Sequence, residues 1–253
     1  MLSRRRIATF GAGSGGAILA LVLTGCSSEN VATFGFDRGI TSVNDHALPL
    51  WQLFWVLAIV VGALTAGLIF WSVIFHRRKG NEMPKQTQYN IPTEVAYTII
   101  PVILVAVLFA FSARAETKIV KVSPASATVH DITVNGIQWS WQFTYKDAGP
   151  RATVTGTPEQ PPILYLPLNE PVRFTITASD VDHGFWIPAF MIQRMNIPGA
   201  TSQLEFTAKK LGEFPGRCNM LCGRNHAQML FTVKVVPAAE YQNYISTLKA
   251  AQS

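Results

Sequence analysis

The chain has 253 residues, which allows one or two folded domains beside any membrane segments. It is 49% hydrophobic and only 14% charged, a low charged share for a purely soluble protein. The formal net charge is +6, and Arg4, Arg5 and Arg6 supply half of this excess. The remainder has no Lys/Arg-rich run, so no nucleic-acid partner is expected. Three cysteines are too few for a disulfide scaffold.

Residues 1–25 are predicted to be a lipoprotein-type signal peptide. The positive Arg4–Arg6 segment is followed by a short apolar run, Ala17–Leu23, which is too short to span a bilayer. Small residues then lead into Cys26, a pattern that resembles a bacterial lipobox. We expect Cys26 to be lipidated and to begin an exported segment, residues 26–47. A plain signal peptide with an incidental cysteine is the alternative, and a twin-arginine signal is a weaker one.

Residues 48–115 are predicted to be a two-helix transmembrane hairpin. The runs Leu48–Phe75 and Val95–Ala113 carry no charge, and each is long enough to cross the hydrocarbon core. The loop between them contains the basic run Arg77–Lys79, so the positive-inside rule places this loop in the cytoplasm. The rest of the mature chain then lies on the outer face of a bacterial plasma membrane. Two buried core helices are the alternative, which the basic loop between the runs disfavours.

Residues 116–237 change to short β-type runs separated by turn residues, a spacing typical of an all-β sandwich. Examples of these runs are Val129–Asn135, Trp139–Tyr145, Ile163–Leu166, Val172–Ala178, Ser202–Thr207 and Met229–Val235. The length of this segment suits one Greek-key sandwich domain. Residues 238–253 follow as a C-terminal helix and tail, with the apolar side chains of Ala238–Ala250 on one face.

The run from Cys218 to Met229 carries the chemistry. It gathers two thiols, the imidazole of His226 and a thioether, while His183 lies upstream between predicted strands. Soft sulfur donors with imidazole select copper over hard cations. Cys222 with two histidines and Met229 would already make a single-copper site. If the loop folds back, Cys218 adds a second thiolate, and two bridging thiolates would hold two copper ions.

Two other interpretations of the same residues stay open. Two exported cysteines four residues apart, Cys218 and Cys222, can form a disulfide, but this leaves the histidines unexplained. Two cysteines and two histidines can bind zinc, but this leaves Met229 and the β-sandwich context unexplained. Copper is therefore the preferred interpretation.

The segment resembles the CuA domain of cytochrome c oxidase subunit II, whose motif is Cys-x-Glu-x-Cys-Gly-x-x-His-x-x-Met. The matching positions are Cys218, Cys222, Gly223, His226 and Met229, with His183 in an upstream His-x-Phe-Trp-Ile-Pro. The resemblance covers nearly all of the mature chain and implies a cupredoxin-like fold with a dinuclear copper centre. The implied ligands are His183, Cys218, Met220 through its backbone carbonyl, Cys222, His226 and Met229.

The resemblance also implies two roles outside the ligand set. Trp139 occupies the position where electrons reach the domain, although alternation of aromatic residues along its strand equally suits a packed face. Glu94 lies at the start of the second helix, where relatives have the mouth of a proton path into subunit I. An acid is favoured there by the helix dipole in any case. Met220 and Met195 stand where relatives carry acids that reach an interfacial magnesium or manganese ion, so we do not expect that ion here.

The function that the resemblance implies is electron transfer within a proton-pumping terminal oxidase, a translocase. Electrons would pass from a c-type cytochrome to the copper centre and then to subunit I, which holds haem and CuB and reduces oxygen. No catalytic residue is expected in this chain, and subunit III and membrane lipid are further expected partners. Asp180 and Asp182 flank His183, yet from Glu116 onward 12 basic residues face 10 acidic ones. This balance favours a membrane-bound donor over a strongly basic soluble one.

Three rival functions share parts of this pattern. A membrane-anchored copper carrier or chaperone would have little use for a helix hairpin with an acid at its start. A quinol oxidase subunit II has the same fold without the copper centre, which Cys218 and Cys222 argue against. A nitrous oxide reductase CuA domain would come with a large catalytic domain. The chain has no Cys-x-x-Cys-His, so it carries no c-type haem of its own.

Overall fold

The computed structural model describes residues 31–78, 80–81, 83, 85–124 and 128–252. The predicted signal peptide and Cys26 lie outside the described residues. The chain divides into two units, residues 1–38 and residues 39–253. The described part of the first unit forms short turns. The helices and sheets that follow belong to the second unit.

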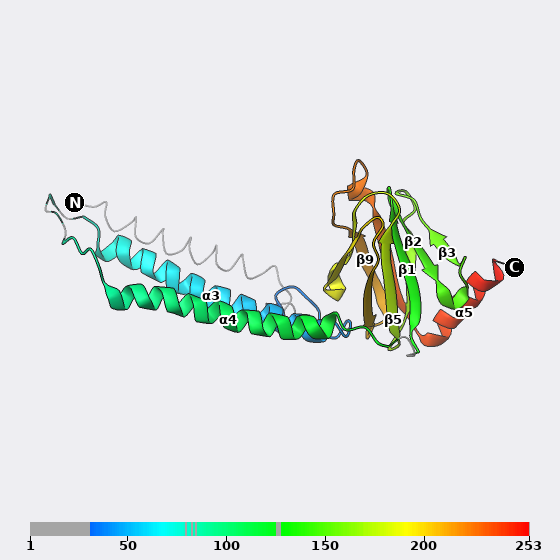
Figure 1. The fold of residues 1–253 in the computed structure, drawn as a ribbon, viewed down its shortest axis with the longest axis horizontal. Coiled ribbons are helices and arrows are strands. Elements are labelled where there is room, and N and C mark those ends of the chain that lie inside the picture. The colour runs from blue at the N-terminus through cyan, green and yellow to red at the C-terminus, as the bar shows by residue number, and fades with distance from the viewer. Residues whose placement is uncertain (1–30, 79, 82, 84, 125–127, 253) are drawn as a thin grey trace, which may run out of the picture. The chain divides into compact units, whose positions relative to one another are not determined.

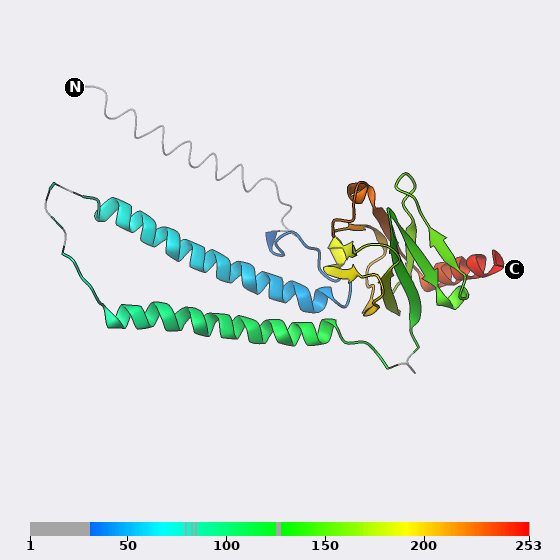
Figure 2. The same cartoon turned by 45° about the horizontal axis from the view of Figure 1, so that its top comes forward.

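Two long apolar helices come first, α3 (Asn44–Phe75) and α4 (Ile91–Ile119). They run side by side in opposite directions (Figures 1 and 2) and share an apolar contact. Each has an 18-residue window with a mean hydropathy of 2.5, and none of either window is buried within the chain. A helix with all of its backbone groups paired and its apolar side chains facing outward suits the interior of a bilayer. The predicted two-helix hairpin is confirmed.

Both helices begin before the apolar runs from which they were predicted. At α4 the cause is a cap: Asn90 Oδ1 accepts the Thr93 N–H at 3.3 Å, and Glu94 Oε1 accepts the Asn90 N–H at 2.9 Å. This reciprocal pair satisfies two backbone donors that have no partner within the helix. Hydropathy finds only the apolar part of a helix, whereas the polar cap determines where the helix starts.

The remaining chain forms two five-stranded sheets packed face to face (Figure 1). The first sheet contains, in spatial order, β3 (Thr153–Thr155), β2 (Ser140–Tyr145), β1 (His130–Ile137), β5 (Pro171–Ala178) and β8 (Ser202–Thr207). The second contains β4 (Ile163–Pro167), β10 (Leu230–Val236), β9 (Gly212–Cys218), β6 (His183–Ile187) and β7 (Ile192–Asn196). The pairs β1–β5 and β4–β10 are parallel, and the other pairs are antiparallel. The chain crosses between the sheets repeatedly, which confirms the predicted cupredoxin-like Greek-key sandwich.

Four strands were not predicted: β3, β6, β7 and β9. β6 and β9 contain glycine or proline, and β7 is mostly polar, so their sequences lack the alternation that marks a half-buried strand. Their pairing partners hold them in the sheet despite this weak local preference. The strand predicted at Trp139 begins one residue later, at Ser140, which leaves Trp139 in the turn before β2.

Aromatic side chains fill the space between the sheets. Trp141 and Phe143 of β2 are fully buried and contact Phe231 of β10 edge-on, with ring centroids 5.4 and 5.7 Å apart. Phe231 also stacks on Phe185 of β6 at 4.9 Å. Gly216 of β9 lies opposite Phe231 in the ladder, and a Cβ at Gly216 would overlap the Phe231 ring. This close approach fixes the position of β9 at Gly216, which is two residues before Cys218.

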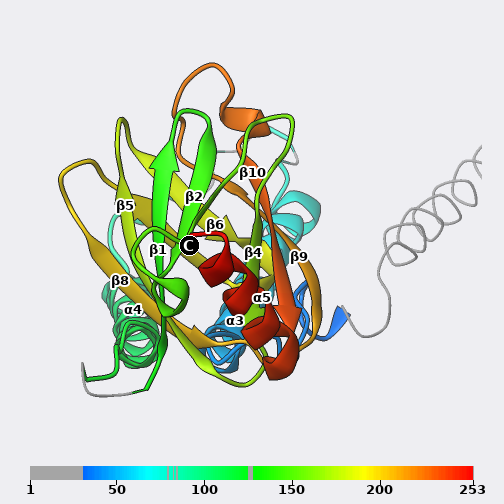
Figure 3. The ribbon, with the colours of Figure 1, turned by 90° about the vertical axis from the view of Figure 1, so that its right-hand side faces the viewer.

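The helix α5 (Ala238–Ala250) lies at the end of the sandwich where the chain ends (Figure 3). It was predicted with these bounds, and it buries Tyr241 and Ile245 on the predicted face. The ring of Tyr241 contacts that of His130 edge-on at 5.0 Å. His130 in turn lies between two carboxylates, with Nδ1 at 2.5 Å from Asp147 and Nε2 at 2.6 Å from Glu170. Both ring nitrogens can donate at once only when His130 is protonated.

This arrangement predicts a pH-dependent stability. The hydrogen bond with Asp147, opposed by burial and helped by Glu170, raises the pKa of His130. A raised folded-state pKa adds stability that is fully present below the unfolded value of about 6.5 and is lost as pH rises through the folded value. We expect the melting temperature of the detergent-solubilised chain to fall as pH rises from about 6.5 through the folded-state pKa of His130. This decrease should be smaller in His130→Gln.

The matched control is His76→Gln, because His76 is exposed and has no ion pair with a carboxylate among the described residues. Its melting temperature should follow pH as the unmodified chain does. If the melting temperatures of the unmodified chain and His130→Gln fall equally with pH, the ion pairs of His130 do not produce the pH dependence.

Candidate metal centre

The loop between β9 and β10 carries five of the six predicted ligands. Cys218 is the last residue of β9, and Met229 directly precedes β10, so these two residues mark the ends of the loop. The Cys218 N–H donates to the Met229 carbonyl at 3.0 Å. The antiparallel pairing of β9 with β10 therefore folds the loop back on itself. This is the condition under which both thiols reach one site.

The sixth predicted ligand, His183, comes from β6, which pairs with β9 in the same sheet. We expected His183 between strands, but it is the first residue of β6, a strand that the glycine after it concealed. The Gly184 N–H lies 3.5 Å from Cys218 Sγ, and the Gly184 carbonyl accepts the Asn219 N–H at 3.1 Å. A Cβ at Gly184 would overlap Asn219 Oδ1 and lie 3.0 Å from the Met220 backbone nitrogen, so glycine permits this approach without a shift of Asn219.

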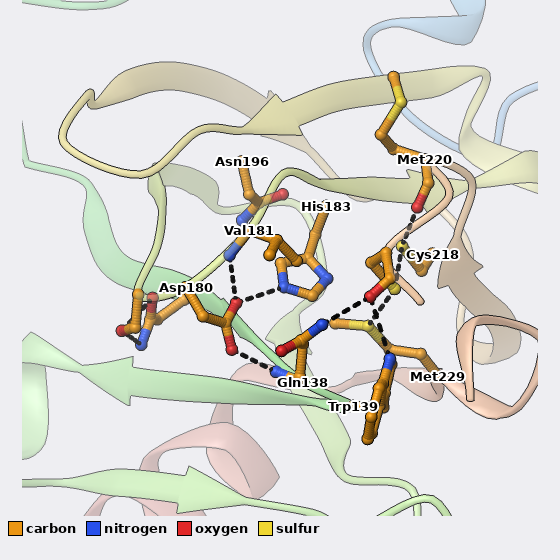
Figure 4. A network of polar contacts seen from close by, with 12 residues as sticks. Gln138, Trp139, Asp180, Val181, His183, Asn196, Cys218, Met220 and Met229 are labelled. Atoms are coloured by element: carbon orange, nitrogen blue, oxygen red, sulfur yellow. Dashed lines mark hydrogen bonds and ion pairs between the residues drawn. The ribbon is translucent and has the colours of Figure 1, made fainter. Parts of the chain in front are cut away.

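The predicted ligand atoms lie close together, and Figure 4 shows His183, Cys218, Met220 and Met229 among them. The two thiol sulfurs of Cys218 and Cys222 lie 3.8 Å apart, and a nitrogen of His183 lies within 4.8 Å of both. The Met220 carbonyl oxygen is 3.1 Å from Cys218 Sγ. On the other side of the pair, His226 Nδ1 and Met229 Sδ lie 3.6 and 3.8 Å from Cys222 Sγ. The structure thus brings all six residues together.

The two thiols are free and buried, and their separation is almost twice the S–S bond length of about 2.05 Å. Burial raises the pKa of the Cys218 thiol, but the neighbouring His183 imidazole and the Gly184 N–H outweigh burial and lower this pKa to about 6. Burial and the charge of Cys218 raise the pKa of Cys222 to about 12. These opposite shifts of pKa favour a thiolate at Cys218 over one at Cys222, and the thiolate is the form that binds metals.

The donor set fits a soft metal ion. His183 is fully buried, and its Nδ1 has no hydrogen-bond partner among the described residues. A buried nitrogen without a partner is costly unless it binds something. Two sulfurs and two imidazoles suit copper or zinc, while the fully buried thioether of Met229, close to Cys222, favours copper.

Two further predicted residues are not among the predicted ligands. Trp139 is half-buried in the turn before β2, and its indole Nε1 donates to the Cys222 carbonyl at 3.1 Å. This places the indole beside the backbone of Cys222, outside the strand face on which we expected it. Glu94 lies in the first turn of α4, where its carboxylate caps the helix.

Gln138 joins the site although sequence reasoning gave it no role there. Its side-chain amide donates to the Cys222 carbonyl at 2.9 Å, beside the Trp139 indole. Asp180 was noted only as an acid near His183, yet its carboxylate contacts His183 Nε2 at 2.8 Å. The sequence gives no indication of the contact between Gln138 and Cys222, because these two residues meet only through the packing of the two sheets.

Comparison with known proteins gives a consistent result. The family model for the periplasmic domain of cytochrome c oxidase subunit II matches residues 159–236. The probable cytochrome c oxidase subunit 2 of Streptomyces avermitilis is 37% identical over 92% of this chain and 84% of its own length. The cytochrome c oxidase subunit 2 of Mycobacterium tuberculosis is 30% identical over 90% of this chain and 78% of its own.

Among solved structures, the chain is similar to the periplasmic domain of subunit II of the cytochrome oxidase of Bradyrhizobium japonicum. That crystal structure is 30% identical, covers 53% of this chain and all of its own, and superimposes with a TM-score of 0.44.

Proposed function

The chain belongs to the cytochrome c oxidase subunit II family, and on this premise we propose that it receives electrons from a c-type cytochrome at a two-copper centre and passes them to haem in subunit I. Membership makes it an electron-transfer, copper-binding part of an oxidoreductase complex. The observation that carries the two-copper centre is the pair of free, buried thiols 3.8 Å apart, flanked by His183 and His226.

In this proposal the thiolates of Cys218 and Cys222 would hold both ions. His183, His226, Met229 and the backbone carbonyl of Met220 would supply the other ligands. When bound, such a pair supplies one-electron transfer with little change of geometry, because the unpaired electron is shared. The chain contributes rigidity and exclusion of water: both cysteines are 4% exposed, and His183 and Met229 are fully buried.

Trp139 is the proposed position at which electrons reach the domain. Its indole is partly open to solvent, and it donates a hydrogen bond to the backbone of Cys222, a proposed ligand. The packing function suggested by the sequence is compatible with this role, because Trp139 also contacts the core. The proposed donor is a c-type cytochrome, and the near balance of charges after Glu116 favours a membrane-bound one.

The other expectations from sequence are proposed on similar grounds. The basic loop at Arg77–Lys79 supports a cytoplasmic connection between the helices, with the copper domain, residues 116–237, on the outer face. Residues 1–25 are proposed as a cleaved signal, Cys26 as the lipidated residue and subunit III as a further partner. Glu94 is proposed at the mouth of a proton path into subunit I, a role compatible with its capping of α4.

The two-copper proposal predicts how copper content responds to single substitutions. The full chain, purified in detergent and loaded with copper, should hold two copper ions whose electron paramagnetic resonance shows one electron shared by two nuclei. Cys218→Ser should lose one bridge, and with it one copper and the shared pattern. Met220→Leu is the matched control, because it keeps the backbone carbonyl and should keep both ions.

A single copper in the unmodified chain, unaffected by Cys218→Ser, would instead make the protein a mononuclear copper carrier. Loss of both ions in Met220→Leu would contradict ligation through the backbone carbonyl.

The role of Trp139 predicts a separation of rate from copper content. Trp139→Phe removes the donor to the Cys222 carbonyl, and it should slow reduction of the copper centre by the cytochrome at least about tenfold while copper content stays unchanged. Stopped-flow absorbance of the purified oxidase measures this rate. Trp186→Phe is the control, because Trp186 is a half-buried β6 residue without a hydrogen bond to Cys222. Equal rates in the two variants would remove Trp139 from the electron path.

A further inference from the structure

The carboxylate of Asp180 joins two parts of the metal centre that are far apart in the sequence (Figure 4). Asp180 lies in the loop between β5 and β6, three residues before His183. Its Oδ1 lies 2.8 Å from His183 Nε2 and accepts the Val181 N–H at 2.7 Å. Its Oδ2 accepts the Gln138 N–H at 2.6 Å. Both oxygens are therefore engaged by donors inside the protein.

The contact with Oδ1 determines which nitrogen of His183 is available to a metal. An ionised carboxylate can only accept, so the proton of a neutral His183 imidazole must sit on Nε2. Nδ1 then keeps its lone pair, and Nδ1 is the buried atom without a partner. The His183 ring packs closely against the backbone of Gly136, where an added Cβ would lie 2.7 Å from His183 Cδ2, and edge-on against Trp141, with ring centroids 6.2 Å apart.

The contact with Oδ2 holds the turn that covers the second cysteine. This turn places two donors on the Cys222 carbonyl: the Gln138 amide at 2.9 Å and the Trp139 indole at 3.1 Å. Gly223, the next residue, permits this contact, since a Cβ there would lie 3.2 Å from the Trp139 ring. The Asp180 carboxylate thus holds the ring of His183 through Oδ1. Through Oδ2 it holds the Gln138–Trp139 turn, which contacts the backbone of Cys222.

We propose that Asp180 is the positioning residue of this centre: it directs His183 Nδ1 toward the thiols and holds the Gln138–Trp139 turn against Cys222. The inference rests on the proposed copper function. Partners of this kind orient a ligating imidazole and raise its basicity, which stabilises the oxidised metal. Loss of the carboxylate therefore weakens copper binding and raises the reduction potential. It also releases the turn that carries Trp139.

The chain offers a matched control in Asp182. This acid is two residues away and exposed, and it makes no hydrogen bond or ion pair with the described residues. Asp180→Asn and Asp182→Asn change the charge equally, but only the first removes an acceptor from His183 or Gln138. A purely electrostatic effect on the donor would therefore appear in both variants, whereas a positioning effect would appear only in Asp180→Asn.

The test uses the full chain in detergent, loaded with copper. Competition with a chelator should show copper affinity about 10–100-fold lower in Asp180→Asn. The reduction potential should rise, and the paramagnetic resonance pattern should change. Asp182→Asn should match the unmodified chain in all three.

Nitrogen NMR of the metal-free chain separates this inference from the copper function. The His183 Nε2 proton of the unmodified chain should be held in the hydrogen bond to Asp180 and exchange slowly with water, whereas in Asp180→Asn it should shift and exchange faster. Slow exchange of this proton in an unmodified chain that binds no added copper would contradict the proposed function and leave the positioning role standing. If Asp180→Asn keeps the proton exchange rate, the copper affinity and the reduction potential of the unmodified chain, the positioning role is wrong.

Discussion

The metal centre depends on one backbone constraint, the antiparallel pairing of β9 with β10, which ends in the bond from the Cys218 N–H to the Met229 carbonyl. This pairing closes a loop whose two ends are both proposed ligands. Without it, two cysteines four residues apart would be free to separate or to join as a disulfide. The pairing in turn depends on the sandwich core, where Gly216 leaves room for the ring of Phe231 and so lets β9 pack closely against it. Core packing therefore positions the end of β9, where Cys218 lies.

The surroundings of the loop then set its chemistry. Two buried thiols cannot both ionise easily without a cation, because each new charge is desolvated and repelled by the other. The opposite pKa shifts of Cys218 and Cys222 express this conflict. A soft cation resolves it by neutralising both sulfurs. His183 Nδ1 and the buried thioether of Met229 are two further donor atoms at the site. Nδ1 has no hydrogen-bond partner among the described residues, and burial of such a polar atom costs free energy unless it binds something.

Sequence reasoning predicted the parts of this fold that are encoded locally. The hairpin, α5 and six of the strands follow from hydropathy and alternation, and the set of six converging residues follows from the resemblance to the CuA domain. It failed where tertiary pairing overrides local preference. β6 begins with His-Gly, and β9 contains Phe-Pro-Gly, so neither resembles a strand, yet these two strands bring His183 beside Cys218. The approach of Gln138 to Cys222 was equally invisible, because nothing in the spacing of residues 138 and 222 indicates contact.

The proposed function requires that six residues of this chain hold two copper ions. Anomalous X-ray scattering at the copper edge, from crystals of the copper-loaded protein, would locate these ions. We expect two resolved copper peaks, both within bonding distance of Cys218 Sγ and Cys222 Sγ, with His183 Nδ1 on one and His226 on the other. A single peak bound by Cys222 alone of the two cysteines, or a peak that His183 does not contact, would contradict it.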